Sequence, residues 1–193
     1  MSTEVVHIRK SKSAKGREVV QSARAQEFVF AVVGHIGSGT STVVRTLKDI
    51  PEVEGFDISI IKASDCIAAW SSSGNDLPNR NTRAHLKAMQ DRGDEMRKDD
   101  PCAVAREIVR KIRSTRTSRE STQRPHFYLI DSLRHPAEVH LLRSIYGRCF
   151  ALIGVVCDEA VRKDRIRDKY SDIGASVEEV MAYDAKAGPD HSQ

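Results

Sequence analysis

The sequence lacks long hydrophobic runs, paired cysteines and clustered aromatic residues. No apolar run approaches the roughly 20 residues of a membrane span, and the first residues lack the apolar core of a signal peptide. The four cysteines include no C-x-x-C pair, so neither a disulfide framework nor a zinc site is predicted, and Cys149 and Cys157 look like ordinary buried thiols. Aromatic residues make up 5% of the chain, and no nucleic-acid-reading motif is recognisable. These absences favour a cytoplasmic protein without a membrane partner and argue against nucleic acid.

Length and charge predict one domain preceded by a basic arm. The 193 residues suffice for a proper core, and 39% of them are hydrophobic. Residues 1–25 contain six basic and two acidic residues, whereas the charges of the remaining chain cancel. We expect a flexible arm over residues 1–25 and a domain over residues 26–190. The alternative for the arm is contact with nucleic acid or an acidic partner.

A glycine-rich segment follows the first apolar run. The run Phe28–Val33 predicts a buried strand, and Gly34–Ser41 after it matches the phosphate-loop pattern G-x-x-x-x-G-K-[ST] except at one position. Thr40 stands in the lysine slot, so the charge that normally helps to transfer a phosphate is missing. An ordinary glycine-rich turn is the alternative. The candidate phosphate-binding residues are Gly34, Gly37, Ser38, Gly39, Thr40, Ser41 and Thr42, the last of which begins a predicted helix.

Two side chains are candidates for holding Mg²⁺. Ser41 occupies the place in the loop where a hydroxyl ligates Mg²⁺ beside the β- and γ-phosphates. Asp131 follows the apolar run Phe127–Ile130, as does the carboxylate that orders Mg²⁺ in phosphate-loop proteins. A strand-end aspartate without such a role is the alternative, but its pairing with the loop favours function. We therefore expect Mg²⁺ with a nucleoside triphosphate as the ligand.

A basic segment follows the last apolar run. Arg162 and Arg165 share a face of a predicted helix. In a phosphate-binding protein these arginines could close over the nucleotide as a lid and supply the charge that Thr40 does not. The alternative is a solvated helix face whose arginines pair with Asp164 and Asp168.

The order of the apolar runs predicts an α/β fold. Continuous rather than alternating runs, typical of strands covered on both faces, lie at Phe28–Val33, Ile58–Ile61, Phe127–Ile130 and Phe150–Val156. Helical patterns lie at Arg83–Arg97, Ala103–Ile112, His135–Tyr146, Ala160–Lys169 and Val177–Ala185. This alternation predicts a layered α/β/α sandwich around a mainly parallel sheet.

Two further segments match known motifs. Asp131–Val139 looks like D-[SG]-[IVL]-[RK]-x-P-x-E, and Met89–Arg97 is similar to Q-D-x-G-[DN]-x-[LM]-R. Both motifs resemble those of small nucleotide kinases related to the dephospho-coenzyme A and deoxynucleotide kinases. The resemblance implies a three-layer α/β/α P-loop NTPase fold of the nucleotide-kinase type. It also implies that Arg97 and Arg134 approach an acceptor phosphate, with Asp131 and Arg134 as catalytic residues.

One subgroup is more similar still, over the segments Gly37–Ser41, Ile130–Val139, Leu152–Val155 and the ending around Asp184. These segments resemble the antiphage deoxycytidine nucleotide deaminases. Members of that subgroup join a kinase-like P-loop domain without the lysine to a zinc-dependent deaminase domain. The 193 residues contain no H-x-E and no P-C-x-x-C, which zinc deaminases require, so we expect the deaminase domain and its zinc to be absent from this chain.

Two functions therefore compete. The first is a nucleotide-binding regulatory module that reports to a zinc-dependent deaminase domain or subunit. The second is a nucleotide kinase in which Arg162, Arg165 or Arg167 replaces the missing lysine. A homo-oligomer is compatible with either function.

Overall fold

Four parallel strands form the centre of the fold. The computed structural model describes residues 27–70, 77–118 and 124–186. The strands are β1 (Glu27–Gly34), β2 (Asp57–Lys62), β3 (His126–Leu133) and β4 (Phe150–Val155). They lie in the order β2-β3-β1-β4, and each neighbouring pair is parallel. The predicted α/β fold with a parallel sheet is confirmed.

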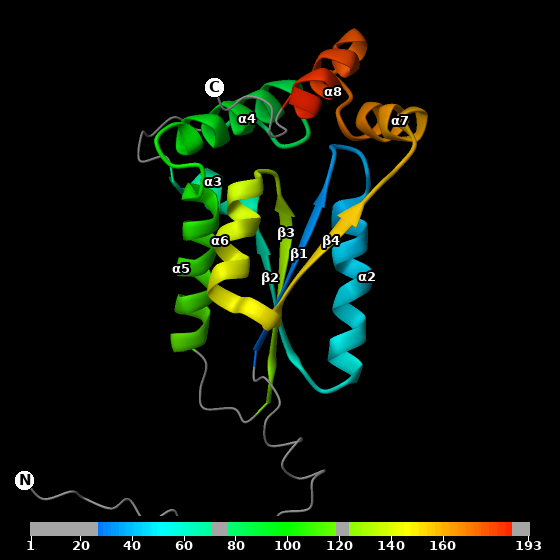
Figure 1. Cartoon of the computed structure of the whole chain (residues 1–193). Coiled ribbons are helices and arrows are strands. Elements are labelled where there is room, and N and C mark those ends of the chain that lie inside the picture. The colour runs from blue at the N-terminus through cyan, green and yellow to red at the C-terminus, as the bar shows by residue number, and fades with distance from the viewer. Residues whose placement is uncertain (1–26, 71–76, 119–123, 187–193) are drawn as a thin grey trace, which may run out of the picture.

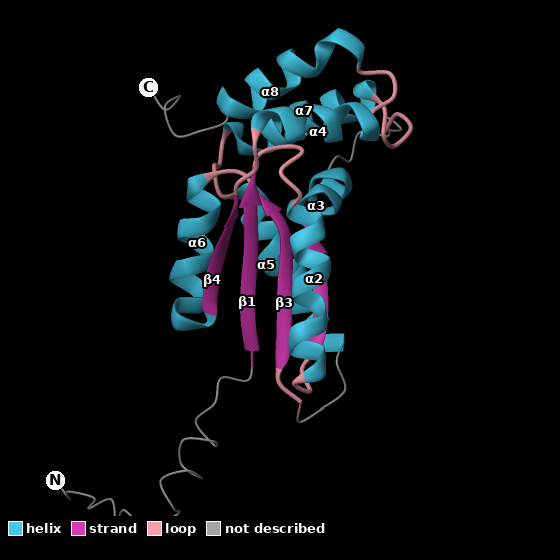
Figure 2. Cartoon of the chain, turned by 90° about the vertical axis from the view of Figure 1, so that its right-hand side faces the viewer, coloured by secondary structure: helices cyan, strands magenta, loops and turns pink. Residues whose placement is uncertain are grey.

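Helices cover both faces of the sheet and the carboxyl ends of its strands. The helices are α2 (Thr40–Val53), α3 (Ala63–Trp70), α4 (Arg83–Lys98), α5 (Ala103–Ser118), α6 (Pro136–Tyr146), α7 (Glu159–Lys169) and α8 (Val177–Lys186), with 3-10 turns at Gly147–Cys149 and Gly174–Ser176. In Figure 1, α2 covers one face of the sheet, and α5 and α6 cover the other. Figures 1 and 2 both place α4, α7 and α8 beyond the carboxyl ends of the strands. This arrangement is a three-layer α/β/α sandwich with a cap of three helices.

The core has three parts that match these layers. The largest part lies between the sheet and the helices α3, α5 and α6, and contains the fully buried Tyr128, Ile108 and Leu142. A second part packs α2 against the opposite face through Val32, Val44 and Leu129. The third part joins the cap helices to one another. The cap therefore has an apolar core of its own.

Local sequence explains where several helices begin. Pro136 occupies the first turn of α6, where its missing N–H costs nothing, and the His135 side chain accepts a hydrogen bond from Ala137 N at 3.1 Å. Thr82 Oγ accepts from His85 N at the start of α4, at 3.1 Å. The Asp158 carboxylate accepts from Ala160 N at the start of α7, at 2.8 Å. The helices α4, α6 and α7 thus each begin at a residue whose side chain accepts a hydrogen bond from the first turn.

Several predicted boundaries were wrong. β3 continues through Asp131 to Leu133, so this aspartate lies within the strand and is not its last residue. β4 ends at Val155, and Val156 is 96% exposed. Helix α3 was not predicted, because it follows β2 directly without a turn residue. The predicted buried thiols Cys149 and Cys157 are half-buried.

Part of the predicted domain organisation lies outside the described residues. The expected basic arm, residues 1–25, and the last residues of the expected domain, 187–190, belong to that part.

None of the described helices has both the length and the apolar character needed to cross a lipid bilayer.

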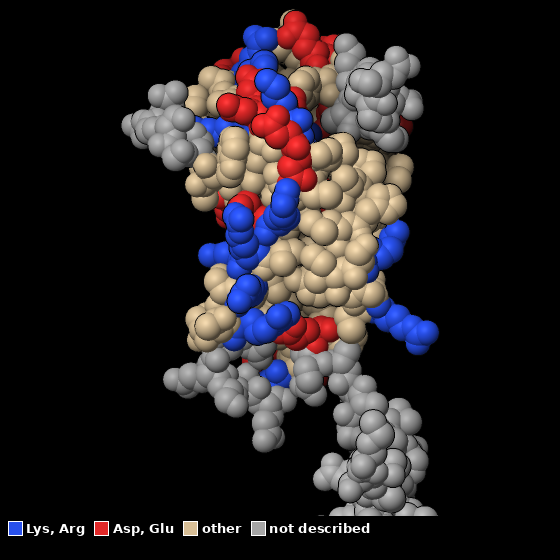
Figure 3. All heavy atoms as spheres, turned by 60° about the vertical axis from the view of Figure 1, so that its left-hand side comes forward, with Lys and Arg blue, Asp and Glu red and all other residues tan. Residues whose placement is uncertain are grey.

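Basic side chains gather on the α5 side of the molecule. Figure 3 shows Lys and Arg in a band down the face that contains α5. Three arginines of this helix pair with carboxylates: Arg106 with Asp100, Arg110 with Glu107 and Arg116 with Glu27. Carboxylates therefore offset much of the positive charge of the helix.

Candidate functional site

The segment Gly34–Ser41 forms a tight turn between β1 and α2. Gly37 and Gly39 have φ angles of +78° and +97°, in the left-handed region that favours glycine. A Cβ on Gly34 would lie 2.6 Å from Ser38 Oγ and 2.8 Å from Val155 O, so this position is too crowded for a side chain. The first turn of α2 contains no acidic residue. The amino end of α2 therefore presents its partial positive charge without an acidic residue in its own first turn.

Ser41 and Asp131 meet at this end of the sheet. Ser41 Oγ donates a hydrogen bond to Asp131 Oδ2 at 2.9 Å. The two residues come together because β1 and β3 are neighbours, with Val32 in register with Asp131. The structure thus places the two predicted Mg²⁺ ligands side by side.

The donor set at this position fits Mg²⁺. A hydroxyl and a carboxylate are hard oxygen ligands of the kind that Mg²⁺ prefers. The described residues contain no group of three or more His, Cys, Asp or Glu that could hold a metal. In proteins, Mg²⁺ is usually bound by one or two carboxylates together with phosphate oxygens and water.

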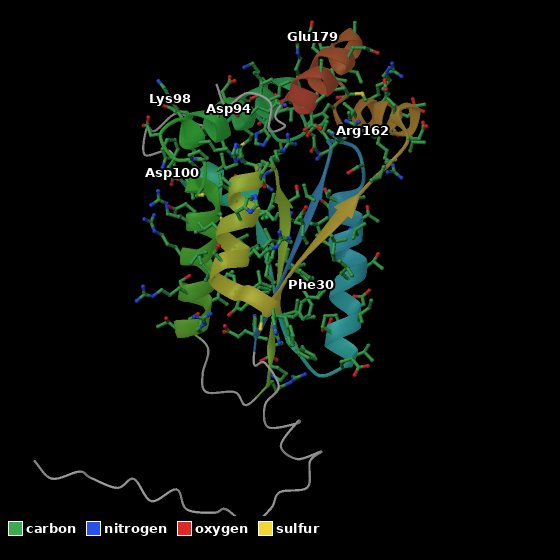
Figure 4. All side chains as sticks on the ribbon, viewed as in Figure 1. Phe30, Asp94, Lys98, Asp100, Arg162 and Glu179 are labelled. Carbon is green, nitrogen blue, oxygen red and sulfur yellow. The ribbon has the colours of Figure 1, made fainter. Side chains whose placement is uncertain are left out.

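Two arginines of α7 lie against the loop. Arg162 Nε donates to Ile36 O at 3.0 Å, and Figure 4 shows this residue on α7 above the carboxyl ends of the strands. Arg165 Nη1 donates to Gly37 O at 3.3 Å and to Ser38 O at 3.2 Å. The same nitrogen lies 3.2 Å from the point that a Cβ on Gly39 would occupy, next to the lysine slot at Thr40.

Two other basic residues of α7 pair with carboxylates. Lys163 lies within 3.0 Å of Glu159 and within 3.9 Å of Glu178, and Arg167 lies 3.4 Å from Asp164. The two interpretations of the basic segment therefore apply to different residues. Arg162 and Arg165 contact the loop, whereas the other two belong to a paired helix face.

A buried carboxylate from α8 reaches the same loop. Asp184 Oδ2 accepts a hydrogen bond from Ile36 N at 2.7 Å and lies 3.0 Å from His35 Nδ1. Arg134 Nη1 donates to Asp184 Oδ1 at 2.6 Å, and Arg162 Nη2 lies 3.6 Å from Oδ2. The Asp184 side chain is only 5% exposed. Four groups that could bind an anion thus converge on one carboxylate.

Arg97 lies apart from the loop, in a buried ion pair. Its Nε donates to Glu138 Oε1 at 2.8 Å, and the Glu138 side chain is fully buried. Glu138 Oε2 also accepts from the backbone N–H groups of Arg134 and His135, at 3.1 and 3.2 Å. The motif residues Arg97 and Arg134 are thus connected through Glu138, and their contact with an acceptor phosphate stays a prediction.

A hollow lies next to the loop, at the carboxyl ends of β1, β3 and β4. Its volume is about 280 Å³, and its lining includes Gly34, His35, Arg134, Val155 and Asp184. Ligands of open parallel sheets bind at this end of the strands. The hollow therefore adjoins both the loop and the arginine that the kinase motif singles out.

His35 and Glu138 were not among the site residues predicted from the sequence, and neither were the contacts that Asp184 makes with the loop. Glu138 has a local signal, because a glutamate two residues after a helix-starting proline is typical of a capping box, and the structure contains that box. Asp184 has a periodic signal. Val177, Val180, Met181 and Asp184 follow helical spacing, which places an acid on an apolar helix face, and all four are buried.

Comparison with known proteins finds a likeness among solved structures. No protein-family model matches the sequence, and no curated protein sequence matches it. Among solved structures, the chain is similar to a gluconokinase from Sinorhizobium meliloti 1021, with 16% identity and a TM-score of 0.49. The match covers 88% of this chain and 79% of that one. The fold class rests on the strand order, the parallel pairing and the layers described above.

Proposed function

We propose that this chain binds a nucleoside triphosphate together with Mg²⁺ at Gly34–Ser41. The hydrogen bond from Ser41 Oγ to Asp131 Oδ2, at 2.9 Å, is the observation that carries the proposal. It joins a loop hydroxyl to a carboxylate on the neighbouring strand, which is the pair that holds Mg²⁺ in phosphate-loop proteins.

Each part of the site has a role in this function. Backbone N–H groups of the loop and the amino end of α2 would bind the phosphates. Ser41 and Asp131 would hold the Mg²⁺, which offsets phosphate charge when it is bound. Arg162 and Arg165 would supply additional positive charge from α7, since both already contact the loop.

The finer proposal is a regulatory role. The motifs at Gly37–Ser41 and Ile130–Val139 support a nucleotide-sensing half of an antiphage deoxycytidine nucleotide deaminase, whose partner would be a zinc-dependent deaminase domain or subunit. Thr40 in the lysine slot supports binding over catalysis, because binding tolerates the loss of this charge better. Deoxycytidine nucleotides are therefore the first ligands to test beside ATP.

Replacing Asp131 by asparagine tests the proposal. In the wild-type chain we expect Mg²⁺ to strengthen nucleotide binding at least about tenfold, because the metal links phosphate to Asp131. In Asp131→Asn this strengthening should fall below about twofold, since one charged ligand is lost. Calorimetric titration with and without Mg²⁺ measures both values. Asp49→Asn, on the exposed surface of α2, is the matched control. An unchanged Mg²⁺ effect in Asp131→Asn would contradict the proposed metal site.

One observation favours the second candidate function, a nucleotide kinase. Arg165 Nη1 lies beside Gly39, close to the slot where the lysine would stand, so a guanidinium is available to stabilise a transferring phosphoryl group. If this function is correct, the chain should transfer phosphate from ATP to a nucleoside monophosphate.

The kinase candidate makes a specific prediction for Arg165. Arg165→Ala should reduce the transfer rate by about 100-fold or more, because one such charge contributes a few kcal/mol to transition-state stabilisation. Arg167→Ala, from the same helix, should leave the rate unchanged, because its guanidinium pairs with Asp164. A radiolabelled-ATP transfer assay measures both. Absence of transfer by the wild-type chain would eliminate this candidate and leave the binding function.

A further inference from the structure

The Asp184 carboxylate makes the contacts expected of a bound phosphate. It accepts a backbone N–H of the loop, from Ile36 at 2.7 Å, and a guanidinium N–H of Arg134 at 2.6 Å. A second guanidinium, from Arg162, lies 3.6 Å away. Backbone N–H groups and paired arginines are the donors that bind phosphates in proteins. The chain therefore places its own anion on donors that a ligand phosphate would use.

The helix that carries Asp184 belongs to the cap and not to the sheet. Its buried Val177, Val180 and Met181 pack in a cluster with Ile166 of α7 and with Tyr170 and Ile173, which follow that helix. The partly buried Ile36 packs against this cluster from the loop. The contacts of α8 in this cluster are therefore to the other cap helices, the segment that follows α7 and the loop. Displacement of α8 would leave the core between the sheet and its covering helices intact.

Other polar side chains of α8 contact α4, another helix of the cap. Arg83 of α4 donates to Glu179 at 2.9 Å, and Tyr183 hydrogen-bonds to Asp94 of the same helix. Burial, and then this hydrogen bond, raise the pKa of Tyr183 above its ordinary value. Asp184 thus adds polar contacts of α8 with the loop and with Arg134, the residue that follows β3.

We propose that Asp184 is a displaceable latch: its carboxylate occupies phosphate donors beside the loop, and nucleotide binding expels it and releases α8. This inference rests on the proposed nucleotide-binding function. A phosphate and a carboxylate cannot share these donors, because two anions in contact repel each other. The latch would thus convert nucleotide binding into a movement of the helix at the carboxyl end of the described chain.

The latch also lowers the apparent nucleotide affinity. When the binding-competent state is only one tenth populated, the apparent dissociation constant is about tenfold weaker than the intrinsic one. Removing the negative charge of Asp184 weakens the closed state, because Arg134 and Arg162 lose their ionic partner. Nucleotide affinity should therefore rise when this carboxylate is neutralised.

Asp184→Asn tests the latch, with Glu179→Gln as the matched control. Glu179 lies on the same helix, but its side chain is 72% exposed and its partner is Arg83, away from the loop. Calorimetric titration with Mg²⁺-ATP should give about tenfold tighter binding for Asp184→Asn and no change for Glu179→Gln. Equal or weaker binding by Asp184→Asn would overturn the latch. Asp184 would then only hold α8 in place.

Hydrogen exchange of the wild-type chain provides a second readout that needs no variant. Saturating Mg²⁺-ATP should speed the exchange of backbone amides in α8 (Val177–Lys186) while α5 keeps its protection. Slower or unchanged exchange in α8, with nucleotide bound, would overturn the latch but leave the binding function standing. Failure of both the wild-type chain and Asp184→Asn to bind any nucleotide would overturn the two proposals together.

Discussion

Replacing Gly39 by valine is expected to weaken nucleotide binding at least about 100-fold, which corresponds to about 2.7 kcal/mol. Gly39 has a φ of +97° and immediately precedes α2, so a β-branched residue could not keep this backbone conformation. A Cβ here would also lie 3.2 Å from Arg165 Nη1, so the added methyl groups would push the arginine away. Calorimetric titration with Mg²⁺-ATP measures the loss.

Gly55→Val is the matched control for this substitution. Gly55 also has a positive φ, of +83°, but it follows α2 at the far end, and a Cβ there meets no atom within 4 Å. Both variants carry backbone strain, but only Gly39→Val changes the loop. Nucleotide affinity should be retained in Gly55→Val. Equal binding by the wild-type chain and Gly39→Val would place the nucleotide elsewhere.

Replacing Glu138 by alanine is expected to lower the free energy of unfolding by about 3–5 kcal/mol. The Glu138 side chain is fully buried, and its carboxylate accepts hydrogen bonds from Arg97 Nε and from two backbone N–H groups at the start of α6. Its removal leaves the Arg97 guanidinium, whose side chain is 15% exposed, without its carboxylate. Urea unfolding followed by circular dichroism measures the change.

Two controls separate the charge from the hydrogen bonds. Glu138→Gln keeps an oxygen acceptor for the backbone donors, so it should lose less stability than the alanine variant. Glu52→Gln removes a carboxylate from an exposed pair with Lys48, in which both side chains are about half exposed, and should change stability by less than about 0.5 kcal/mol. A loss below about 1 kcal/mol in Glu138→Ala would contradict the structural role of this ion pair.

The sequence alone was sufficient to predict the parallel α/β fold and the proximity of Ser41 to Asp131. Apolar runs such as Phe28–Val33 are continuous because helices cover both faces of the sheet. The carboxyl ends of parallel strands lie at one edge, so a glycine-rich loop after one strand and an aspartate near the end of another come close together. The distance of 2.9 Å between Ser41 Oγ and Asp131 Oδ2 confirms that proximity.

Helix α3 illustrates what local sequence could not predict. The chain passes from Lys62 in β2 to Ala63 in α3 without an intervening glycine, proline or other turn residue. Short apolar segments of this kind are compatible with strand or helix, and the packing of Ile67 against the sheet core decides between them. The predicted end of β3 was wrong for a related reason. The strand continues to Leu133, which is also buried in that core.

The contacts around Asp184 depend on tertiary structure. The helical spacing of Val177, Val180 and Met181 indicates a buried face, but it does not say which donors a buried aspartate on that face would meet. Those donors come from Ile36 and Arg134, about 150 and 50 residues earlier in the chain. Only the placement of α8 over the loop brings them together.

The proposed nucleotide site is tested most directly by titrating the full chain with ATP, GTP, dCTP and dCMP, each with and without Mg²⁺, in a calorimeter. We expect saturable binding of a triphosphate at one site and a marked gain in affinity when Mg²⁺ is present, because the phosphates, Ser41 and Asp131 would share the metal. Absence of binding by all four nucleotides under both conditions would contradict it.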